Sequence, residues 1–308
     1  MTTAELDAQR SQREGLLASL IAYVLWGLFP IYFVLVASVA PFEVLAHRII
    51  WAVPFGALIL YIRKQWPEVR PVWRDRNMLF WLALSALCIS CNWLIYIWAV
   101  QQEMVLQTSL GYFTNPLMYV LVGVIFLRER LRRAQIVAVI LAAIGVLYLT
   151  FTAGEFPWVA ISLAALFTAY GVIRKQVAIG AMPGLFVETI LLFPFAASWL
   201  GWLIYWGGSE FVSGDIGITL LLVAGGPITV IPLLLFAVGA RRLSLTVIGF
   251  MQYVAPSLQF LVGIYFGEQL TQPLLVCFVF IWTAIAVFSI DAYLSRTRTP
   301  PRVASVES

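Results

Sequence analysis

Apolar runs of about 20 residues recur along the whole 308-residue chain, and this recurrence limits the fold more than any other feature. A run of that length is what an α-helix needs to cross the hydrocarbon core of a bilayer. The runs do not alternate with a period of two, so helices are expected rather than barrel strands. The sequence therefore predicts an all-α membrane protein with ten transmembrane helices. The predicted spans are 16–37, 42–62, 79–100, 105–127, 134–151, 157–173, 184–206, 216–239, 246–266 and 274–294.

The composition is typical of a chain surrounded by lipid. Hydrophobic residues make up 62% of the chain and charged residues 11%, whereas soluble domains carry about a quarter charged residues. The net charge of +4 does not indicate a nucleic-acid surface, because no large soluble domain remains outside the spans. The first fifteen residues are polar and the first apolar run is long enough to remain in the membrane, so no cleavable signal is expected. The expected partners are the lipid bilayer and a small-molecule substrate.

The basic residues predict the orientation of the spans. Eighteen of the 19 Lys and Arg residues fall in the two tails and the even-numbered loops, and the odd-numbered loops carry none. Basic residues resist translocation, so these segments are expected in the cytoplasm, with the protein in the cell inner membrane. A miscounted helix would scatter the charges over both sides, so the split also supports the count of ten. The odd-numbered loops hold acidic residues instead, namely Glu103, Glu155, Glu210, Asp215 and Glu268.

The sequence matches itself weakly at an offset of about 140 residues. The matches include Pro54-Phe55 with Pro194-Phe195, Pro116 with Pro256, and Leu121-Val122-Gly123 with Leu261-Val262-Gly263. Each repeat holds five spans, and since five is odd the second half must enter the membrane upside down. Inverted repeats of this kind are a recurrent transporter design. The predicted parts are an N-terminal tail (1–15), a first repeat (16–151), a second, inverted repeat (157–294) and a C-terminal tail (295–308).

Amides and tyrosines lie inside several of the predicted spans, at spacings that put them on one helix face. Lipid-facing amides would be costly, so these side chains are expected to face the bundle interior. There they either join helices through hydrogen bonds or line a solvated cavity. Matching faces in the two repeats favour a cavity, whose aromatic lining suits an amphipathic small molecule. The candidates for the substrate cavity are Asn92, Tyr96, Gln107, Tyr112, Asn115, Tyr119, Gln252 and Gln259.

Two charged residues within spans, Arg48 and Glu188, align at the same offset. Because the repeats are inverted, the two should lie near opposite faces as a symmetric pair of gate or coupling residues, with a role as structural anchors as the alternative. His47, the single histidine, is a further gate or coupling candidate, and simple packing is its alternative. The aligned Pro116 and Pro256 are hinge candidates, and packing kinks are the alternative for each.

No pattern indicates catalytic residues, a metal site or a cofactor. One histidine and scattered acids form no catalytic constellation, and no Walker A pattern for ATP hydrolysis is present. The cysteines inside spans are interpreted as packing residues; they are Cys88, Cys91 and Cys277. A stripe of small residues in the fifth span predicts close helix contact, within the chain or in a homodimer. The stripe is Ala134, Ala138, Ala142 and Gly145.

Several stretches of the sequence carry a family resemblance. They are Ala22-Tyr23 with Trp26-Gly27, residues 43–51 around His47-Arg48, and residues 92–100, 109–117 and 252–257. These stretches resemble the RarD group of EamA-type transporters, and the likeness runs from about Gly15 to Asp291. Arg128 stands where that group is expected to have a glycine. The resemblance implies a member of the drug/metabolite transporter superfamily, with ten helices, two inverted five-helix repeats and export of metabolites.

The expected function is therefore a secondary transporter that exports small amphipathic metabolites or drugs by alternating access. An intramembrane enzyme and a non-transporting scaffold are the alternatives. A scaffold would not need an inverted repeat, and an enzyme would need the reactive cluster that the sequence lacks.

The predicted orientation is testable by cysteine labelling in intact cells. In a background without native cysteines, Glu210→Cys should react with a membrane-impermeant maleimide from outside. Arg70→Cys should react only after lysis, because the positive-inside rule places residues 63–76 in the cytoplasm. Labelling of residue 70 from outside would contradict the topology.

Overall fold

The computed structural model describes residues 3–127, 132–154, 156–213, 215–240, 242–243, 247–248 and 251–297, and over these residues it contains helices and no strand. The helices are α1 (Thr3–Gly27), α2 (Phe29–Leu35), α3 (Pro41–Ile62), α4 (Trp66–Val69), the 3-10 helix η1 (Arg70–Arg74), α5 (Arg76–Gln101), α6 (Val105–Leu127), α7 (Arg133–Ala153), α8 (Trp158–Gln176), α9 (Ala181–Tyr205), α10 (Glu210–Ser213), α11 (Ile216–Ala240), α13 (Val254–Tyr265) and α14 (Gln272–Thr297).

Eight helical segments of the described chain are long and apolar enough to cross a membrane, with α1 and α2 counted as one segment. α13 is a shorter apolar helix, and α6 covers the predicted span 105–127. Helix is present in each predicted span, although only part of 246–266 is described. The all-α fold predicted from the apolar runs is thus confirmed.

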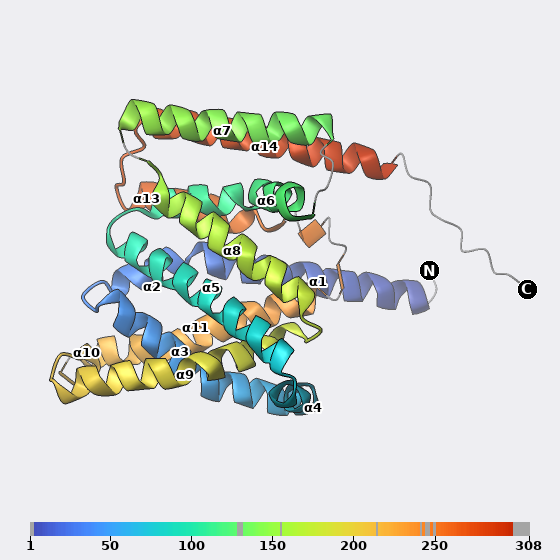
Figure 1. The fold of residues 1–308 in the computed structure, drawn as a ribbon. Coiled ribbons are helices and arrows are strands. Elements are labelled where there is room, and N and C mark those ends of the chain that lie inside the picture. Colours follow the sequence, from blue (N-terminus) through green and yellow to red (C-terminus); the bar gives the residue numbers. More distant parts are fainter. Residues whose placement is uncertain are drawn as a thin grey trace, which may run out of the picture.

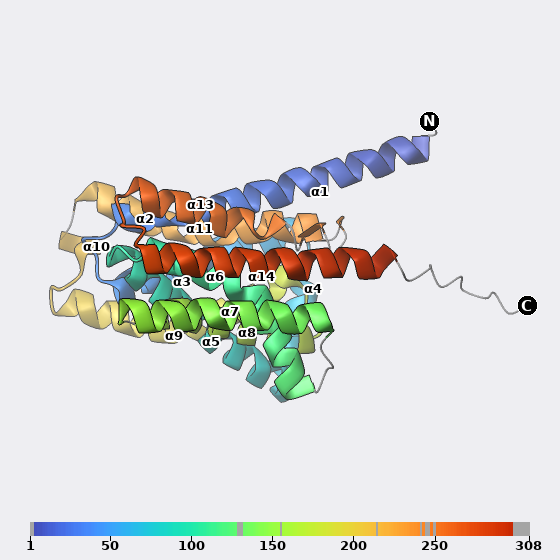
Figure 2. The same cartoon turned by 90° about the horizontal axis from the view of Figure 1, so that it is seen from above.

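The long helices run roughly along one direction and form a bundle (Figures 1 and 2). α7 and α14 lie side by side on one flank, α3 and α9 lie on the other, and α6, α8 and α13 lie between them (Figure 1). α1 begins, α14 ends and α4 lies at one end of the bundle, while α10 lies at the other (Figure 1). We call the first the basic end, because residues 63–76 around α4 are rich in arginine, and the second the opposite end.

Large apolar side chains cover the outside of the bundle. Phe151, Phe195 and Tyr265 are 83%, 76% and 84% exposed, and many Leu, Ile and Trp side chains are exposed with them. Soluble monomers rarely expose contiguous apolar patches larger than a few hundred Å². This surface is therefore one that hydrocarbon covers.

Local sequence signals set the helix boundaries. Asp75 caps α5, since its carboxylate accepts hydrogen bonds of 3.0 Å from the backbone N–H groups of Asn77 and Met78. Gly154 follows α7 with φ of 71°, a left-handed conformation that glycine adopts without steric cost. The start of α7 is tied to α14 by an ion pair of 3.1 Å between Arg132 and Asp291.

The small-residue stripe of the fifth span faces α14 within the same chain. Ala138 and Ala142 are buried, and a Cβ at Gly145 would meet Phe280 and the backbone of Cys277. The stripe therefore serves close packing of α7 on α14, the first of its two predicted uses. A homodimer would need a different surface.

The first span differs from its prediction as one continuous helix over 16–37. It is broken at Leu28, and α2 ends at Leu35. The cause is Pro30, which has no N–H to donate to the carbonyl of Trp26 four residues earlier. The Nε2 of Gln259 on α13 donates to that freed carbonyl at 3.2 Å. The buried amide of Gln259 therefore joins two helices.

Residues 1–15 were expected to be a tail, but α1 begins at Thr3. The segment is rich in Ala, Glu, Gln, Leu and Arg, which favour helix, and Arg10 pairs with Glu14 one turn later at 3.3 Å. At the other terminus α14 continues to Thr297, three residues past the end predicted for the tenth span.

Glu268, in the loop between α13 and α14, caps the start of α6. Its carboxylate accepts hydrogen bonds from the backbone N–H groups of Val105 and Leu106, the latter at 2.8 Å. Burial raises the pKa of this carboxyl, while the two N–H donors oppose the shift by stabilising the anion. The contact joins two loops of the opposite end that are far apart in the sequence.

Replacing Glu268 should measure the strength of that cap. Glu268→Ala would leave two N–H groups at the start of α6 without their acceptor, which costs about 1–2 kcal/mol for a lost N-terminal cap. The variant should lower the melting temperature of the purified protein in detergent. Gln102→Ala, an exposed position at the same end, is the matched control and should melt like the wild type. Equal melting of all three proteins would remove the cap from the fold's stabilising contacts.

Candidate functional site

Arg48 lies seven residues into α3, with only 2% of its surface exposed. Its Nε donates a hydrogen bond of 3.0 Å to the hydroxyl oxygen of Thr229 on α11. The hydroxyl of Thr229 in turn donates to the carbonyl of Gly225 at 2.8 Å, so its oxygen is free to accept. Arg48 therefore links α3 to α11 inside the bundle.

Aromatic rings enclose the guanidinium group of Arg48. Its central carbon lies 4.7 Å from the ring centre of Trp93, 5.2 Å from that of Phe33 and 5.8 Å from that of Phe29. A cation over a ring face is stabilised by about 0.5–2 kcal/mol, more when water is excluded. Within the described part of the chain, no carboxylate lies within 4.0 Å of its nitrogens. Rings and one hydroxyl, rather than an acid, hold this charge.

Three of the predicted cavity residues meet beside Arg48. The hydroxyl of Tyr112 donates to Oδ1 of Asn92 at 3.3 Å, and Nδ2 of Asn92 donates to the carbonyl of Leu163 on α8 at 3.0 Å. The rings of Tyr96 and Tyr112 have centres 5.7 Å apart, and both tyrosines are close enough to interact electrostatically with Arg48. We call Arg48, Asn92, Tyr96 and Tyr112 the central cluster.

The other five cavity candidates have no described contact with the central cluster. Gln259 bonds to α1, as noted above, and Gln252 lies in the turn before α13. Tyr119 is 38% exposed, with its hydroxyl against α8 at Gly171. Three of these candidates have a buried side-chain oxygen with no described hydrogen-bond partner, namely Gln107, Asn115 and Gln259. One cavity shared by all eight residues thus stays a prediction, and the contacts join only part of the set.

The two hinge candidates lie in different local settings. Pro116 lies in the interior of α6. Pro256 is the third residue of α13, in the first turn, where the N–H groups have no partner within the helix. Its carbonyl accepts a hydrogen bond of 2.8 Å from the hydroxyl of Ser109 on α6. A hinge role for the pair stays a prediction.

Glu188 is buried on α9 and is already paired. The hydroxyl of Ser85 on α5 donates to its carboxylate, Nε of Arg174 on α8 lies 3.6 Å from Oε1, and the hydroxyl of Tyr170 lies 3.5 Å from Oε2. Arg174 was not predicted as a site residue, because the sixth span was expected to end at residue 173. α8 in fact continues to Gln176, which carries the guanidinium back over the start of α9. Sequence spacing gives no signal for a contact across that turn.

His47 lies in a short chain of polar contacts near the opposite end. Nε1 of Trp51 donates to its Nδ1 at 3.2 Å, so the neutral ring carries its proton on Nε2. That nitrogen lies 4.0 Å from Oε1 of Glu43, which accepts a hydrogen bond of 2.6 Å from Ser209. Glu43 is 1% exposed, and Ser209, in the segment before α11, lies against its carboxylate. Among the described residues, no three His, Cys, Asp or Glu side chains are grouped so as to hold a metal ion.

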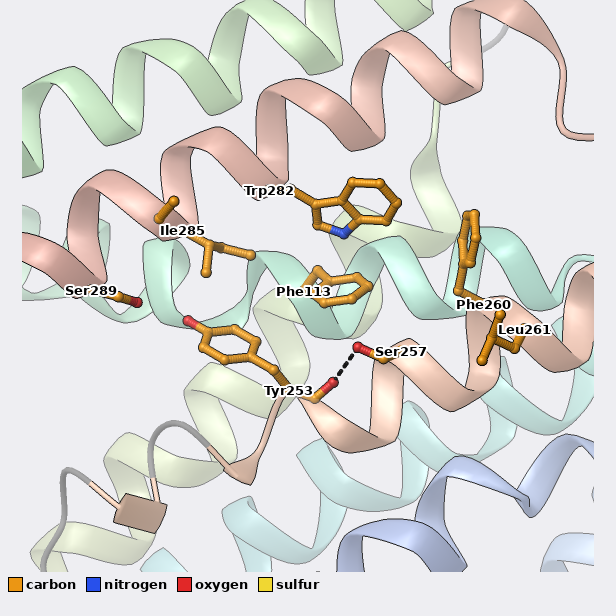
Figure 3. Close-up of a pocket in the computed structure, with 9 residues that line it drawn as sticks. Phe113, Tyr253, Ser257, Phe260, Leu261, Trp282, Ile285 and Ser289 are labelled. Atoms are coloured by element: carbon orange, nitrogen blue, oxygen red, sulfur yellow. Dashed lines mark hydrogen bonds between the residues drawn. The ribbon is translucent and has the colours of Figure 1, made fainter.

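A hollow of about 520 Å³ lies where α6, α13 and α14 meet, away from the central cluster (Figure 3). Figure 3 shows the rings of Phe113, Tyr253 and Trp282 pointing toward the same space. The hydroxyl of Ser257 is turned back to the carbonyl of Tyr253 at 2.7 Å. None of the eight cavity candidates lines this hollow, and none of the described residues that line it is charged.

The sequence of this chain of apolar helices is similar to those of known proteins. A model described as the EamA-like transporter family matches residues 13–151. Protein RarD of Salmonella typhi is 42% identical over 294 residues, which cover 95% of this chain and 100% of that protein. The chain belongs to the RarD group of the EamA-like transporter family. This membership and the apolar helices make it a multi-pass membrane protein.

Two further relatives of this EamA-like chain come from Pseudomonas aeruginosa. An uncharacterized transporter is 42% identical over 304 residues, covering 97% of this chain and 99% of its own. A protein named chloramphenicol-sensitive protein RarD is 33% identical over 290 residues, covering 92% and 96%. A crystal structure of a protein superposes with a TM-score of 0.58 at 20% identity, over 93% of this chain and 98% of that one, which shows a shared fold.

The central cluster should contribute to stability through Asn92. Asn92→Leu would remove the hydrogen bonds with Tyr112 and Leu163 and leave the buried hydroxyl of Tyr112 without its acceptor, at about 1–3 kcal/mol, while the carbonyl of Leu163 keeps its bond within α8. Tyr112→Phe removes a single donor and should cost less. Unfolding of the two variants in SDS, compared with the wild type, gives this order. A larger loss for Tyr112→Phe would contradict the hydrogen-bond assignment.

Proposed function

We propose that this chain is a secondary transporter of the cell inner membrane that exports small amphipathic molecules. In this proposal ten transmembrane helices form two inverted five-helix halves, and exchange of their conformations opens the site to one side and then the other. The observation that carries the proposal is the pattern of helix contacts. The named relatives support transport rather than an intramembrane enzyme or a scaffold, since one of them is called a transporter.

The helix contacts repeat between the two halves. In chain order α1 with α2, α3, α5, α6 and α7 correspond to α8, α9, α11, α13 and α14. α1 packs on α11 and α13, just as α8 packs on α5 and α6. α3 packs on α11, and its counterpart α9 packs less extensively on α5. The pairs α3–α9, α6–α13 and α7–α14 each join a helix to its own counterpart. Two halves related by a two-fold axis would give this pattern.

Side-chain contacts repeat in the same way. Tyr119 of α6 packs at Gly171 of α8, and Leu258 of α13, next to the residue that aligns with Tyr119, packs at Gly27 of α1. These glycines belong to the pairs Trp26-Gly27 and Tyr170-Gly171, which match at an offset of 144 residues, close to the offset of 140 in the rest of the repeat. Arg48 likewise donates a hydrogen bond to a hydroxyl on α11, and Glu188 accepts one from a hydroxyl on α5.

Arg48 and Glu188 are proposed as gate or coupling residues near opposite mouths. Each is seven residues from the start of its helix, or about 10 Å at a rise of about 1.5 Å per residue. α9 starts beside the basic end, where residues 178–180 and Glu68 line a common hollow, and α3 starts at the opposite end. The positive-inside rule makes the basic end cytoplasmic. In this proposal Glu188 or His47 carries any coupled proton.

Transport itself is tested by solute flux into proteoliposomes. The purified chain should move at least one member of a panel of radiolabelled amino acids and drugs, chloramphenicol included, faster than protein-free liposomes do. No flux with any member of the panel would contradict the proposal.

Glu188→Gln should fold but lose flux, or lose the pH dependence of flux. The amide still accepts the hydrogen bond from Ser85, but it no longer pairs with Arg174 or exchanges a proton. Glu210→Gln, an exposed acid at the opposite end, is the control and should transport like the wild type. Normal flux per folded Glu188→Gln molecule, together with a lower melting temperature, would assign Glu188 a structural role.

A further inference from the structure

The charge of Arg48 is unbalanced within the described protein. A guanidinium group has five N–H donors, and the one described hydrogen bond uses Nε. Glu188, the aligned charge of the other half, pairs with Arg174, whereas no described acid is within 4.0 Å of Arg48. An arginine inside a membrane helix is costly even on lenient insertion scales. An arginine kept at such a cost without an acid has donors available for a ligand.

We propose that Arg48 binds the anionic head group of the transported solute, and that this solute is a small monocarboxylate with an aromatic or apolar body. The inference rests on the proposed function, since it names the substrate class of the same site.

The charge of the cluster selects the head group. One unpaired cation is neutralised by one negative charge, whereas a dianion would leave a net buried charge and a cation would be repelled. A planar guanidinium presents two parallel N–H groups that match the two oxygens of a carboxylate. Because water is excluded around Arg48, which is 2% exposed, the pairing is stronger than it would be at a surface.

The walls of the cluster select the body of the solute. Trp93, Phe33 and Phe29 lie around the guanidinium, and the rings of Tyr96 and Tyr112 lie against one another beside it. The hydroxyl of Tyr112 and the amide of Asn92 already bind each other, so they offer little to a sugar or another polyhydroxylated body. An aromatic or branched apolar group fits these walls best.

α2 covers Arg48 and is the element that would admit the solute. It supplies Phe33 and Phe29, two of the three rings over the guanidinium. It is joined to α1 through Leu28 alone, and the next turn contains Pro30. Tyr32 ties α2 to α11 by a hydrogen bond of 3.0 Å to the carbonyl of Leu221. Rotation of this short helix about Leu28 would uncover the guanidinium from the opposite end.

Binding by the purified full-length chain tests the inference with three compounds that share one body. These are 3-phenylpropionate, its neutral amide 3-phenylpropionamide, and the cation 3-phenylpropylamine. We expect the acid to raise the melting temperature in a concentration-dependent way, with an affinity at least about tenfold above those of the amide and the amine. Equal shifts for acid and amide, or no shift with the acid up to about 10 mM, would overturn the inference.

Variants connect the effect to Arg48. Arg48→Gln should abolish the shift caused by the acid, and without ligand it should melt at or above the wild-type temperature, because an unpaired buried charge has been removed. Arg48→Lys keeps the charge without the fork and should retain a weaker shift. Arg74→Gln, an exposed arginine at the basic end, should keep the full shift. An acid shift that persists in Arg48→Gln would overturn the assignment, and if that variant does not fold, the wild-type comparison and Arg48→Lys decide.

Failure of this inference and failure of the proposed function are separable, because binding and flux are measured independently. Flux of a neutral solute with no preference for the acid would keep the transporter and remove the anion site. Acid binding that depends on Arg48, without flux of any solute, would keep the site and remove the transporter.

Discussion

A charge inside an apolar bundle must be stabilised by the protein alone, since hydrocarbon offers it neither water nor a counterion. The interior of this protein is arranged around two solutions to that constraint. Glu188 is paired with Arg174 and accepts a hydrogen bond from a hydroxyl, so its negative charge is balanced inside the bundle. Arg48 is held by ring faces and a hydroxyl, and no described acid balances its positive charge. The polar contacts between α3 and α11, and among α5, α8 and α9, follow from those two arrangements.

The two halves are therefore alike in backbone packing and different in charge. Corresponding helices make corresponding contacts, and each buried charge bonds to a hydroxyl on the helix that symmetry assigns. Symmetry of that kind supports two states of similar energy, which alternating access requires. In the proposed transporter, this difference in charge would favour an anionic solute, because Arg48 has no acid beside it among the described residues, whereas Glu188 is already paired.

Much of the fold could be predicted because its signals are local. Apolar run length located the helices, and Asp75 and Gly154 mark boundaries by ordinary capping chemistry. The break at Leu28 was missed, although Pro30 was visible, since a proline signals a freed carbonyl but not whether the helix ends there. Arg48, Asn92 and Tyr112 could be singled out as candidates because polar groups stand out in apolar spans, and the structure brings them together. Arg174 was missed, since its partner is reached across a turn whose geometry no local pattern encodes. Gln259 was expected in a cavity, but it satisfies the carbonyl that Pro30 frees, a contact 233 residues away in sequence.

The last helix of each half contacts the other half more extensively than it contacts the preceding helix of its own. α14 packs along the full face of α7 and is tied to it by Arg132 and Asp291, while the hollow of Figure 3 separates it from α13 over part of its length. α7 and α14 thus form a packed pair, and this pair contacts the other helices of the bundle mainly through α6. Such a pair can stay still while α2 and the helices around Arg48 rearrange. Lateral pressure from the bilayer on this flank would then act on the stationary pair α7 and α14 and not on the helices that move.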